Sequence, residues 1–293
     1  MKCRLCQSEK TFYVFKKNTI IWGIKEGKEV WTIYECSDCK CRFIDNNQNK
    51  FDISLYYNEG YSENKVKDLE KSKIKSYKRR GKIQSKIINN ILNNKQEKYK
   101  ILDIGCNTGN FLSCLSHKFD KYGVELSAAA AKRASEKNIK VFNNKIEGVK
   151  FEPESFDVVT LFALIEHLED PLTILKKIKR ILKKNGILVI MTGDWRSLKA
   201  RIYGKNWRLY TPPEHQFYFS KYTQLKILEE LGFDNIKNYY TSGGLSSFKN
   251  KYFNLIWKSF LFLFFEYTPQ FNIFKYFNCI PIFDHYYGYF KKR

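Results

Sequence analysis

The fold of this chain is decided by residues 101–112, which read Ile101-Leu102-Asp103-Ile104-Gly105-Cys106-Asn107-Thr108-Gly109-Asn110-Phe111-Leu112. The first four residues predict a buried strand, and residues 109–118 predict a helix. The turn between them consists of small residues, and Gly105 and Gly109 allow a ligand to approach the backbone closely. In an open α/β sheet such a turn lies at the carboxyl end of a strand, where ligands bind. The free N–H groups at the start of the helix would face a carboxylate or a phosphate.

A second acidic side chain, Glu125, ends the next predicted strand, residues 122–125. It follows the first acid by about twenty residues, where a carboxylate can accept hydrogen bonds from both hydroxyls of a ribose. A glycine turn followed by an acidic strand end leaves two candidate ligands, a dinucleotide and S-adenosylmethionine.

Residues 100–240 alternate between apolar strands and amphipathic helices. This pattern predicts an α/β fold with a mostly parallel sheet that is covered on both faces. The further expected strands are residues 140–142, 156–161 and 186–190. The further expected helices are residues 128–137, one that Pro171 opens and Gly186 closes, and residues 221–231, with Ser220 as the N-cap of the last.

Five segments within residues 100–235 resemble the class I S-adenosylmethionine-dependent methyltransferases, in the branch that contains quinone and sugar methyltransferases. Residues 102–109 resemble motif I, and Gly123-Val124-Glu125-Leu126-Ser127 resembles the ribose-binding strand end. Asn107 and Asn185 depart from the family pattern, at turns whose left-handed backbone Asn tolerates. The other similar segments are residues 155–171, 178–188 and 212–220, the last of which contains Pro212-Pro213-Glu214-His215.

The resemblance implies a Rossmann-like, doubly wound fold with S-adenosylmethionine as the cofactor. It places the methionine part of the cofactor at the first turn, the ribose at Glu125, the adenine near residues 142–146 and the transferred methyl group near residues 161–167. The implied cofactor-binding residues are Asp103, Gly105, Cys106, Gly109, Phe111, Glu125, Leu126, Ile146, Leu161, Phe162 and Glu166.

Four residues are candidates for catalysis. A base is needed only if the acceptor must lose a proton, as a sugar hydroxyl or a carbon acid must. His167 and His215 are expected in loops at the carboxyl edge of the sheet, and Tyr210, Glu214 and His215 resemble an arrangement in sugar C-methyltransferases that have an N-terminal zinc module. For His215 two roles are open: a general base, or an anchor that holds the loop by hydrogen bonding.

Residues 1–50 are expected to form a zinc ribbon. Cys3 and Cys6 make one pair, and Cys36 and Cys39 make a second. Together they supply four thiolates, the tetrahedral set of a structural zinc ion. Cys41 is an alternative to Cys39, and scattered cytosolic thiols are the alternative to the whole site.

The rest of the chain is basic or aromatic. The net charge is +22, with 52 Lys and Arg against 30 Asp and Glu, which indicates either an anionic partner or compositional drift, since only ten of the basic residues are Arg. Residues 51–99 are expected to form a basic connector with a helix over 74–93. Residues 241–293 are expected to form a lid and the last strand near 286–290, with peripheral membrane contact as the alternative.

Composition and length exclude several classes of protein. Apolar residues make up 43% of the 293 residues, which excludes wholesale disorder, and the length is too short for two ordinary enzyme domains. No signal peptide is apparent, and the longest apolar run, residues 260–265, is far short of the ~20 residues of a transmembrane segment. We therefore expect a cytoplasmic protein.

Three functions are compatible with these observations. The favoured one is a methyltransferase acting on a small-molecule, nucleotide-linked or lipid-linked acceptor, with a sugar of surface-glycan biosynthesis preferred. The second is a zinc-ribbon rRNA methyltransferase, which is disfavoured because no Asn/Asp-Pro-Pro-Tyr motif is present. The third is a non-catalytic scaffold that binds S-adenosylmethionine.

Overall fold

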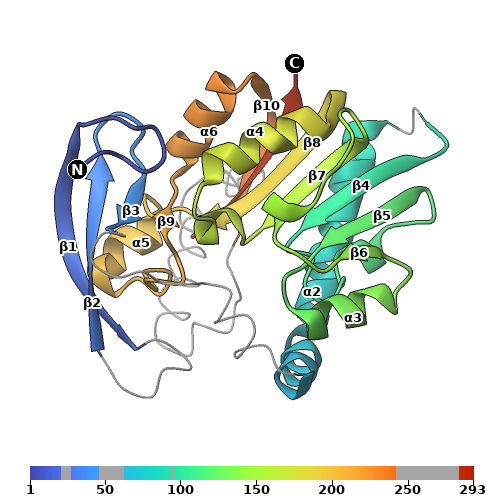
Figure 1. Ribbon diagram of the computed structural model, residues 1–293, viewed down its shortest axis with the longest axis horizontal. Coiled ribbons are helices and arrows are strands. Elements are labelled where there is room, and N and C mark those ends of the chain that lie inside the picture. Colours follow the sequence, from blue (N-terminus) through green and yellow to red (C-terminus); the bar gives the residue numbers. More distant parts are fainter. Residues whose placement is uncertain (21–27, 46–62, 94–95, 242–283) are drawn as a thin grey trace, which may run out of the picture.

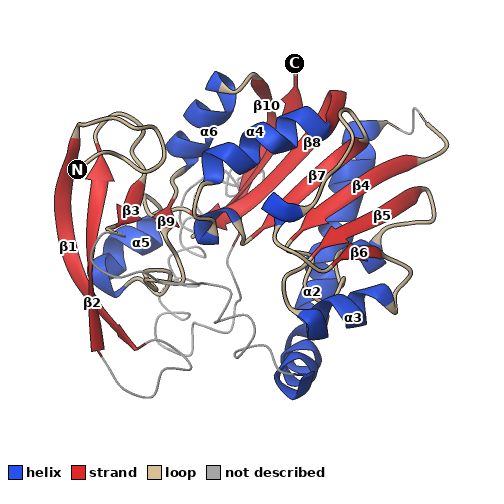
Figure 2. Cartoon of the chain, viewed as in Figure 1, coloured by secondary structure: helices blue, strands red, loops and turns tan. Residues whose placement is uncertain are grey.

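The main body is a seven-stranded sheet in the computed structural model, which describes residues 1–20, 28–45, 63–93, 96–241 and 284–293 (Figures 1 and 2). The strand order is β10-β11-β8-β7-β4-β5-β6. The strands from β6 to β8 run parallel, whereas β11 is antiparallel to both of its neighbours. The mostly parallel, Rossmann-like sheet is therefore confirmed. The bounds are β4 Tyr99–Ile104, β5 Phe119–Val124, β6 Lys140–Phe142, β7 Phe156–Phe162, β8 Leu182–Gly193, β10 Phe233–Thr241 and β11 His285–Lys292.

Helices cover both faces of this sheet because its central strands are apolar on both sides. Val159 and Leu161 of β7 pack with α4 (Pro171–Ile181) and α6 (Lys221–Glu230) on one face. Val158 of the same strand packs with α2 (Glu63–Leu92) and α3 (Ala128–Ser135) on the other. Side chains along a strand alternate between faces, so one apolar run supplies two cores.

The helix boundaries differ from the sequence expectations at three places. The connector helix α2 begins at Glu63, eleven residues before the predicted start. The helix predicted over residues 109–118 is wrong: a single 3₁₀ turn, Leu112–Cys114, stands there, and α2 packs against it through Gly81. α4 ends at Ile181 because β8 begins at the next residue. The expected N-cap is confirmed, since the Ser220 hydroxyl accepts a hydrogen bond from the Thr223 amide.

A second, antiparallel sheet of four strands lies beside the main sheet (Figure 1). Its order is β1 (Thr11–Ile20), β2 (Lys28–Cys36), β3 (Arg42–Ile44) and β9 (Phe217–Tyr218). The last strand comes from a segment far along the chain and pairs Phe217 with Phe43. The small sheet therefore extends beyond residues 1–50, and one apolar core joins it to the main body.

The C-terminal region is described only at its two ends. The expected last strand is β11, which lies inside the sheet between the edge strand β10 and β8. The predicted lid or membrane contact falls on residues 242–283, outside the described residues. No helix in the described part of the chain is long and apolar enough to cross a membrane.

Candidate functional site

The turn after β4 forms the floor of a cleft at the carboxyl edge of the sheet. Gly105, Asn107 and Gly109 all have positive φ angles, of 74°, 48° and 72°. At Gly109 an added Cβ would lie 2.5 Å from Cδ1 of Ile139. The left-handed conformation expected at Asn107 is thus present, and Gly109 serves close packing beneath the turn.

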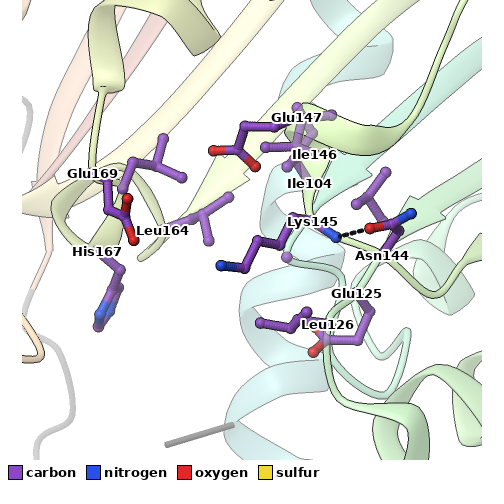
Figure 3. A pocket seen from close by; sticks show the side chains of 13 residues that line it. Ile104, Glu125, Leu126, Asn144, Lys145, Ile146, Glu147, Leu164, His167 and Glu169 are labelled. Atoms are coloured by element: carbon purple, nitrogen blue, oxygen red, sulfur yellow. Dashed lines mark hydrogen bonds between the residues drawn. The ribbon is translucent and has the colours of Figure 1, made fainter. Parts of the chain in front are cut away.

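The cleft has two lobes, with cavity volumes of about 310 and 360 Å³. Gly105, Glu125, Leu164 and His167 line both lobes, and Leu164 lies directly over Gly105. Figure 3 shows the first lobe, with Glu125 and Leu126 on one side and Leu164 and His167 on the other. Each lobe falls within the ordinary volume range of a small-molecule site.

Glu125 occupies the border between the lobes and is held by backbone amides. Its Oε2 accepts from the Asn107 amide at 2.9 Å, and its Oε1 accepts from the Ser127 amide at 2.8 Å. Burial raises its pKa. Each carboxylate oxygen has further lone-pair capacity, so the group can also accept hydrogen bonds from the hydroxyls of a bound ribose.

Asp103 lies in the second lobe and is nearly fully buried. Its Oδ1 accepts a hydrogen bond of 2.6 Å from the Thr160 hydroxyl. Burial raises its pKa to about 7 against the lowering effect of this hydrogen bond, and the nearby Glu125 adds to the rise. A buried carboxylate of this kind gains most from a cationic ligand.

The second lobe is also lined by residues that the sequence patterns did not single out. Tyr77 and Arg80 come from α2, and His285 and Tyr287 come from β11. No local motif marks them, because they reach the lobe only through the docking of α2 and the insertion of β11 between β8 and β10. Of these four residues, Arg80 is the one that the sequence could have singled out, because arginine is rare in this chain.

Beside the cleft lies a group of three side chains, Glu166, His167 and His215, which we call the Glu–His–His cluster. One ligand atom from each lies within 4.8 Å of the others. The imidazole rings of His167 and His215 are 4.6 Å apart and nearly perpendicular. Burial lowers the pKa of His167 to about 4 and lowers that of His215 well below its usual value, so both are neutral at neutral pH.

Each ring in the cluster is anchored through Nδ1. His167 Nδ1 is 2.8 Å from the Glu214 carbonyl, and His215 Nδ1 is 2.8 Å from the Leu209 carbonyl. Because a carbonyl only accepts, Nδ1 carries the proton and Nε2 holds the lone pair. The loop-anchoring contact expected of His215 is therefore present, and it leaves an atom available as a base.

The structure brings together most of the predicted site residues and separates three. Leu161 lies in the core of β7, Gly109 lies beneath the turn, and Tyr210 lies near another cavity, where its hydroxyl accepts from Arg42 at 2.6 Å. Glu166 and His215 lie next to His167. The predicted residues that line the cleft are Asp103, Gly105, Cys106, Phe111, Glu125, Leu126, Ile146, Phe162, His167 and Glu214.

The four cysteines of the N-terminal module converge on one point. Sγ of Cys3 is 3.7 Å from Sγ of Cys39, and Sγ of Cys6 is 3.6 Å from Sγ of Cys36. A tetrahedral ion with Zn–S bonds of about 2.3 Å sets sulfur atoms roughly 3.8 Å apart, so the residues fit zinc. Cys41 lies outside the group, with its Sγ 3.7 Å from the Tyr218 carbonyl.

The cysteine module holds the loop that carries Glu214 and His215. Arg4, between the first two cysteines, donates to Oε1 of Gln216 at 2.7 Å and lies over the ring of Phe217. The Gln216 amide in turn donates to the Glu166 carbonyl at 2.8 Å. The module is thereby coupled to the Glu–His–His cluster through two consecutive hydrogen bonds.

A third cavity lies between the small sheet and α5 (Leu198–Tyr203). Three of the ten arginines line it: Arg42, Arg196 and Arg201. The Arg42 guanidinium lies 3.7 Å from the centre of the Trp195 ring and pairs with Glu35 at 3.0 Å. Arg196 and Arg201 are exposed, so the cavity has net positive charge and an aromatic wall.

The comparisons with known proteins agree with this geometry. A family model described as "Methyltransferase domain" matches residues 76–238. An uncharacterized protein of Methanocaldococcus jannaschii is 32% identical over 136 residues, which cover 46% of this chain and 65% of the relative. The demethylmenaquinone methyltransferase of Lactococcus lactis is 32% identical over 121 residues, covering 38% of this chain and 47% of the relative. This chain thus spans about half to two thirds of these relatives.

Two further methyltransferases are similar to this chain. The ubiquinone biosynthesis O-methyltransferase of Pasteurella multocida is 32% identical over 122 residues, which cover 34% of this chain and 48% of the relative. A solved S-adenosylmethionine-dependent methyltransferase of Thermotoga maritima, described as a possible histamine N-methyltransferase, superposes with a TM-score of 0.52 at 20% identity. It covers 79% of this chain and 97% of its own, and it shows the shared fold.

Proposed function

The chain belongs to the methyltransferase-domain family, and we propose that it transfers the methyl group of S-adenosylmethionine to a small-molecule acceptor, with a phosphate-bearing sugar favoured. The observation that carries the proposal is the pair of acidic strand ends, Asp103 and Glu125, which face one two-lobed cleft over a left-handed turn. This geometry suits a ligand with an adenosine on one side and a cationic amino acid on the other.

The chain's own residues divide the work of binding this cofactor. Glu125 would accept from the ribose hydroxyls, and Leu126 and Ile146 would border the adenine in the first lobe. In the second lobe Asp103 would hold the amino group and Arg80 would hold the carboxylate of the methionine part. S-adenosylmethionine supplies an electrophilic methyl group, so the protein's main task is to align the acceptor with it.

Deprotonation of the acceptor can be assigned to the neighbourhood of His167 and Glu214, which line the second lobe. The neutral imidazole of His215, anchored through Nδ1, can accept a proton at Nε2. The arrangement supports an acceptor that reacts through an ionisable hydroxyl or carbon acid.

The phosphate on the acceptor is argued from the third cavity. Arginine guanidinium groups bind phosphate through paired hydrogen bonds, and the exposed Arg196 and Arg201 line this cavity, whereas Arg42 already covers one face of the Trp195 ring. Tyr210 belongs to this cavity and packs edge-on against Tyr218, whose ring lies 6.4 Å from that of His215. A nucleotide-linked or lipid-diphosphate-linked sugar would place its charged part among the arginines and its sugar toward the cleft.

A second candidate acceptor is a quinone precursor. Two of the relatives are by name methyltransferases of menaquinone and ubiquinone synthesis. The second lobe supports this candidate, since Phe111, Phe162, Met191 and Tyr287 give it an apolar wall suited to an aromatic ring.

We further propose that the four-cysteine group holds a structural zinc ion. With all four positions filled by thiolates, the ion would have no open position for a reactant. Its task would be to hold the small sheet, and through Arg4 and Gln216 the loop of His215, in place. The predicted membrane contact falls on residues outside the described ones, and it stays a prediction, as does the nucleic-acid alternative.

One experiment tests the function and separates the acceptors. The purified chain is incubated with methyl-labelled S-adenosylmethionine and a cell lysate separated into polar, lipid and RNA fractions. Label in the polar fraction, or in a phosphate-containing glycolipid, supports the sugar, whereas label in a quinone precursor supports the second candidate and label in RNA supports neither. Glu125→Gln is the matched loss variant. Failure of the wild type to bind S-adenosylmethionine would refute the proposal.

A further inference from the structure

We propose that Glu166, His167 and His215 bind one divalent transition-metal ion, at a site distinct from the four-cysteine group and adjoining the second lobe of the cleft. The site itself is argued from geometry alone. Its role in catalysis, polarising the oxygen of the acceptor, rests on the proposed function. A metal on Nε2 would occupy the lone pair of His215, so in the metal-bound protein Glu214, which lines the second lobe, would accept the proton in its place.

The first argument is the convergence of ligand atoms of the right type. Two imidazoles and one carboxylate place one ligand atom each within 4.8 Å of one another. Ligands of Zn²⁺ at about 2.0–2.1 Å lie roughly 3.4 Å apart, so small side-chain rotations bring the three atoms into a coordination sphere. The perpendicular arrangement of the two rings, 4.6 Å apart, keeps them from stacking face to face.

The second argument is the orientation of the histidines. In metal sites the ring nitrogen that does not bind the metal usually donates to a carbonyl or carboxylate, which fixes the tautomer. Both rings meet this condition, since Nδ1 of His167 donates to the Glu214 carbonyl and Nδ1 of His215 donates to the Leu209 carbonyl. The lone pair of each ring is therefore on Nε2 before any ligand arrives.

The third argument is an unsatisfied buried acceptor. Glu166 is only 5% exposed, and its Oε2 has no hydrogen-bond partner among the described residues. A buried carboxylate oxygen without a partner is costly. In this cluster the neighbouring ligands also present lone pairs, so a cation would satisfy all three groups at once.

The backbone holds the three ligands on two segments that are tied together. Glu166 and His167 stand in the 3₁₀ turn Ile165–His167, and His215 stands just before β9. The Gln216 amide donates to the Glu166 carbonyl at 2.8 Å, which fixes the spacing of the two segments. A site on two linked segments is preorganised.

The donor set indicates the class of metal and its open side. Two nitrogens and one carboxylate suit Zn²⁺, Fe²⁺, Co²⁺ or Ni²⁺ better than Mg²⁺ or Ca²⁺, which prefer oxygen ligands. Three protein ligands leave coordination positions open. His167 lines both lobes of the cleft, so an open position there would meet an acceptor oxygen and lower its pKa.

The test is the stoichiometry and spectrum of Co²⁺ bound to the full chain. After removal of metal under reducing conditions, the wild type should bind two Co²⁺ ions per chain, one with thiolate-to-metal charge-transfer absorption and one without. Glu166→Gln and His215→Asn should each retain the thiolate site and weaken the second site by at least about 100-fold, as expected when a ligand rather than its supporting group is lost. His117→Asn, an exposed histidine away from the cluster, is the control and should bind two ions.

The outcomes separate this proposal from the proposed function. A single Co²⁺ per chain in the wild type, with thiolate absorption only, would overturn the metal site and leave a metal-free histidine pair. Two ions in Glu166→Gln or His215→Asn with unchanged affinities would also overturn it. Binding of S-adenosylmethionine, measured on the same samples, reports on the proposed function alone, and retained binding in both variants shows that they are folded.

Discussion

Asp103 should make the affinity for S-adenosylmethionine depend on pH in a range where an ordinary aspartate does not titrate. Burial raises its pKa to about 7, and the residue lines the lobe that would receive the amino group of the methionine. Only the ionised carboxylate can pair with that cation. The apparent dissociation constant should therefore scale as one plus the ratio of protonated to ionised Asp103.

With a pKa of about 7, lowering the pH from about 7.5 to about 6 should weaken binding by about eightfold. The pH range ends at about 7.5 because the α-amino group of the cofactor, with a pKa of about 7.7–8.0, loses its own proton above it. Asp103→Asn keeps the shape and can still accept from Thr160. It should remove the pH dependence and weaken binding at the higher pH by about 30-fold, for a charge-assisted hydrogen bond of about 2 kcal/mol.

Isothermal titration calorimetry of the wild type, Asp103→Asn and Glu166→Gln across this range is the assay. Glu166 also has a pKa raised to about 7 by burial, so its neutral variant shows whether it contributes to the slope. We expect Glu166→Gln to keep the wild-type profile. A flat wild-type profile, or an unchanged slope in Asp103→Asn, would refute the assignment of Asp103 to the cofactor's amino group.

Four further predictions follow from particular contacts. Between pH about 4 and about 7 the folded chain keeps the proton on Asp103, whereas the unfolded chain has lost it. The free energy of unfolding therefore falls as the pH rises through this window. At about pH 8, Asp103→Asn should consequently melt at a higher temperature than the ligand-free wild type. Gly109→Ala should cost about 3 kcal/mol of unfolding free energy in urea, whereas Gly204→Ala, with positive φ but open space, should cost about 1 kcal/mol. Arg80→Ala should raise the KM for S-adenosylmethionine by about 10–100-fold, with partial recovery in Arg80→Lys. Cys36→Ser should lower kcat by up to about 100-fold, because the loop that carries His215 would lose its support. The Kd for S-adenosylmethionine, measured by calorimetry, should stay within about twofold of the wild-type value, and a loss of cofactor binding would contradict this prediction.

The strands of the main sheet could be read from the sequence because each one is a short apolar run that is buried on both faces. β4 and β7 lie within two residues of the expected positions at both ends, and β5 begins three residues before its expected start. Leu102 and Val159 show why: local hydrophobicity alone places them in the interior. The predicted helix at 109–118 failed because the docking of α2, a tertiary contact, supplies the cover that this segment would have formed.

Some residues of the candidate site could likewise be predicted from the sequence, and others could not. Asp103 and Glu125 are visible in the sequence because parallel strands bring their carboxyl ends to one edge, whatever the loops do. Glu166 and His215 are far apart in the chain, and no spacing rule predicts that their ligand atoms meet. Arg80 reaches the second lobe from a helix whose packing only the folded chain decides.

By itself, the sequence determined the class of fold, the order of the main strands along the chain, the turn after β4 and the two Cys-x-x-Cys pairs. These features follow from local hydrophobic period and from short-range spacing. The tertiary structure alone decided that β9 completes the N-terminal sheet, that Arg4 holds the loop of His215, and that Tyr210 lies apart from the cleft. Such contacts depend on how distant segments pack, and packing is a property of the whole chain that no window of sequence contains.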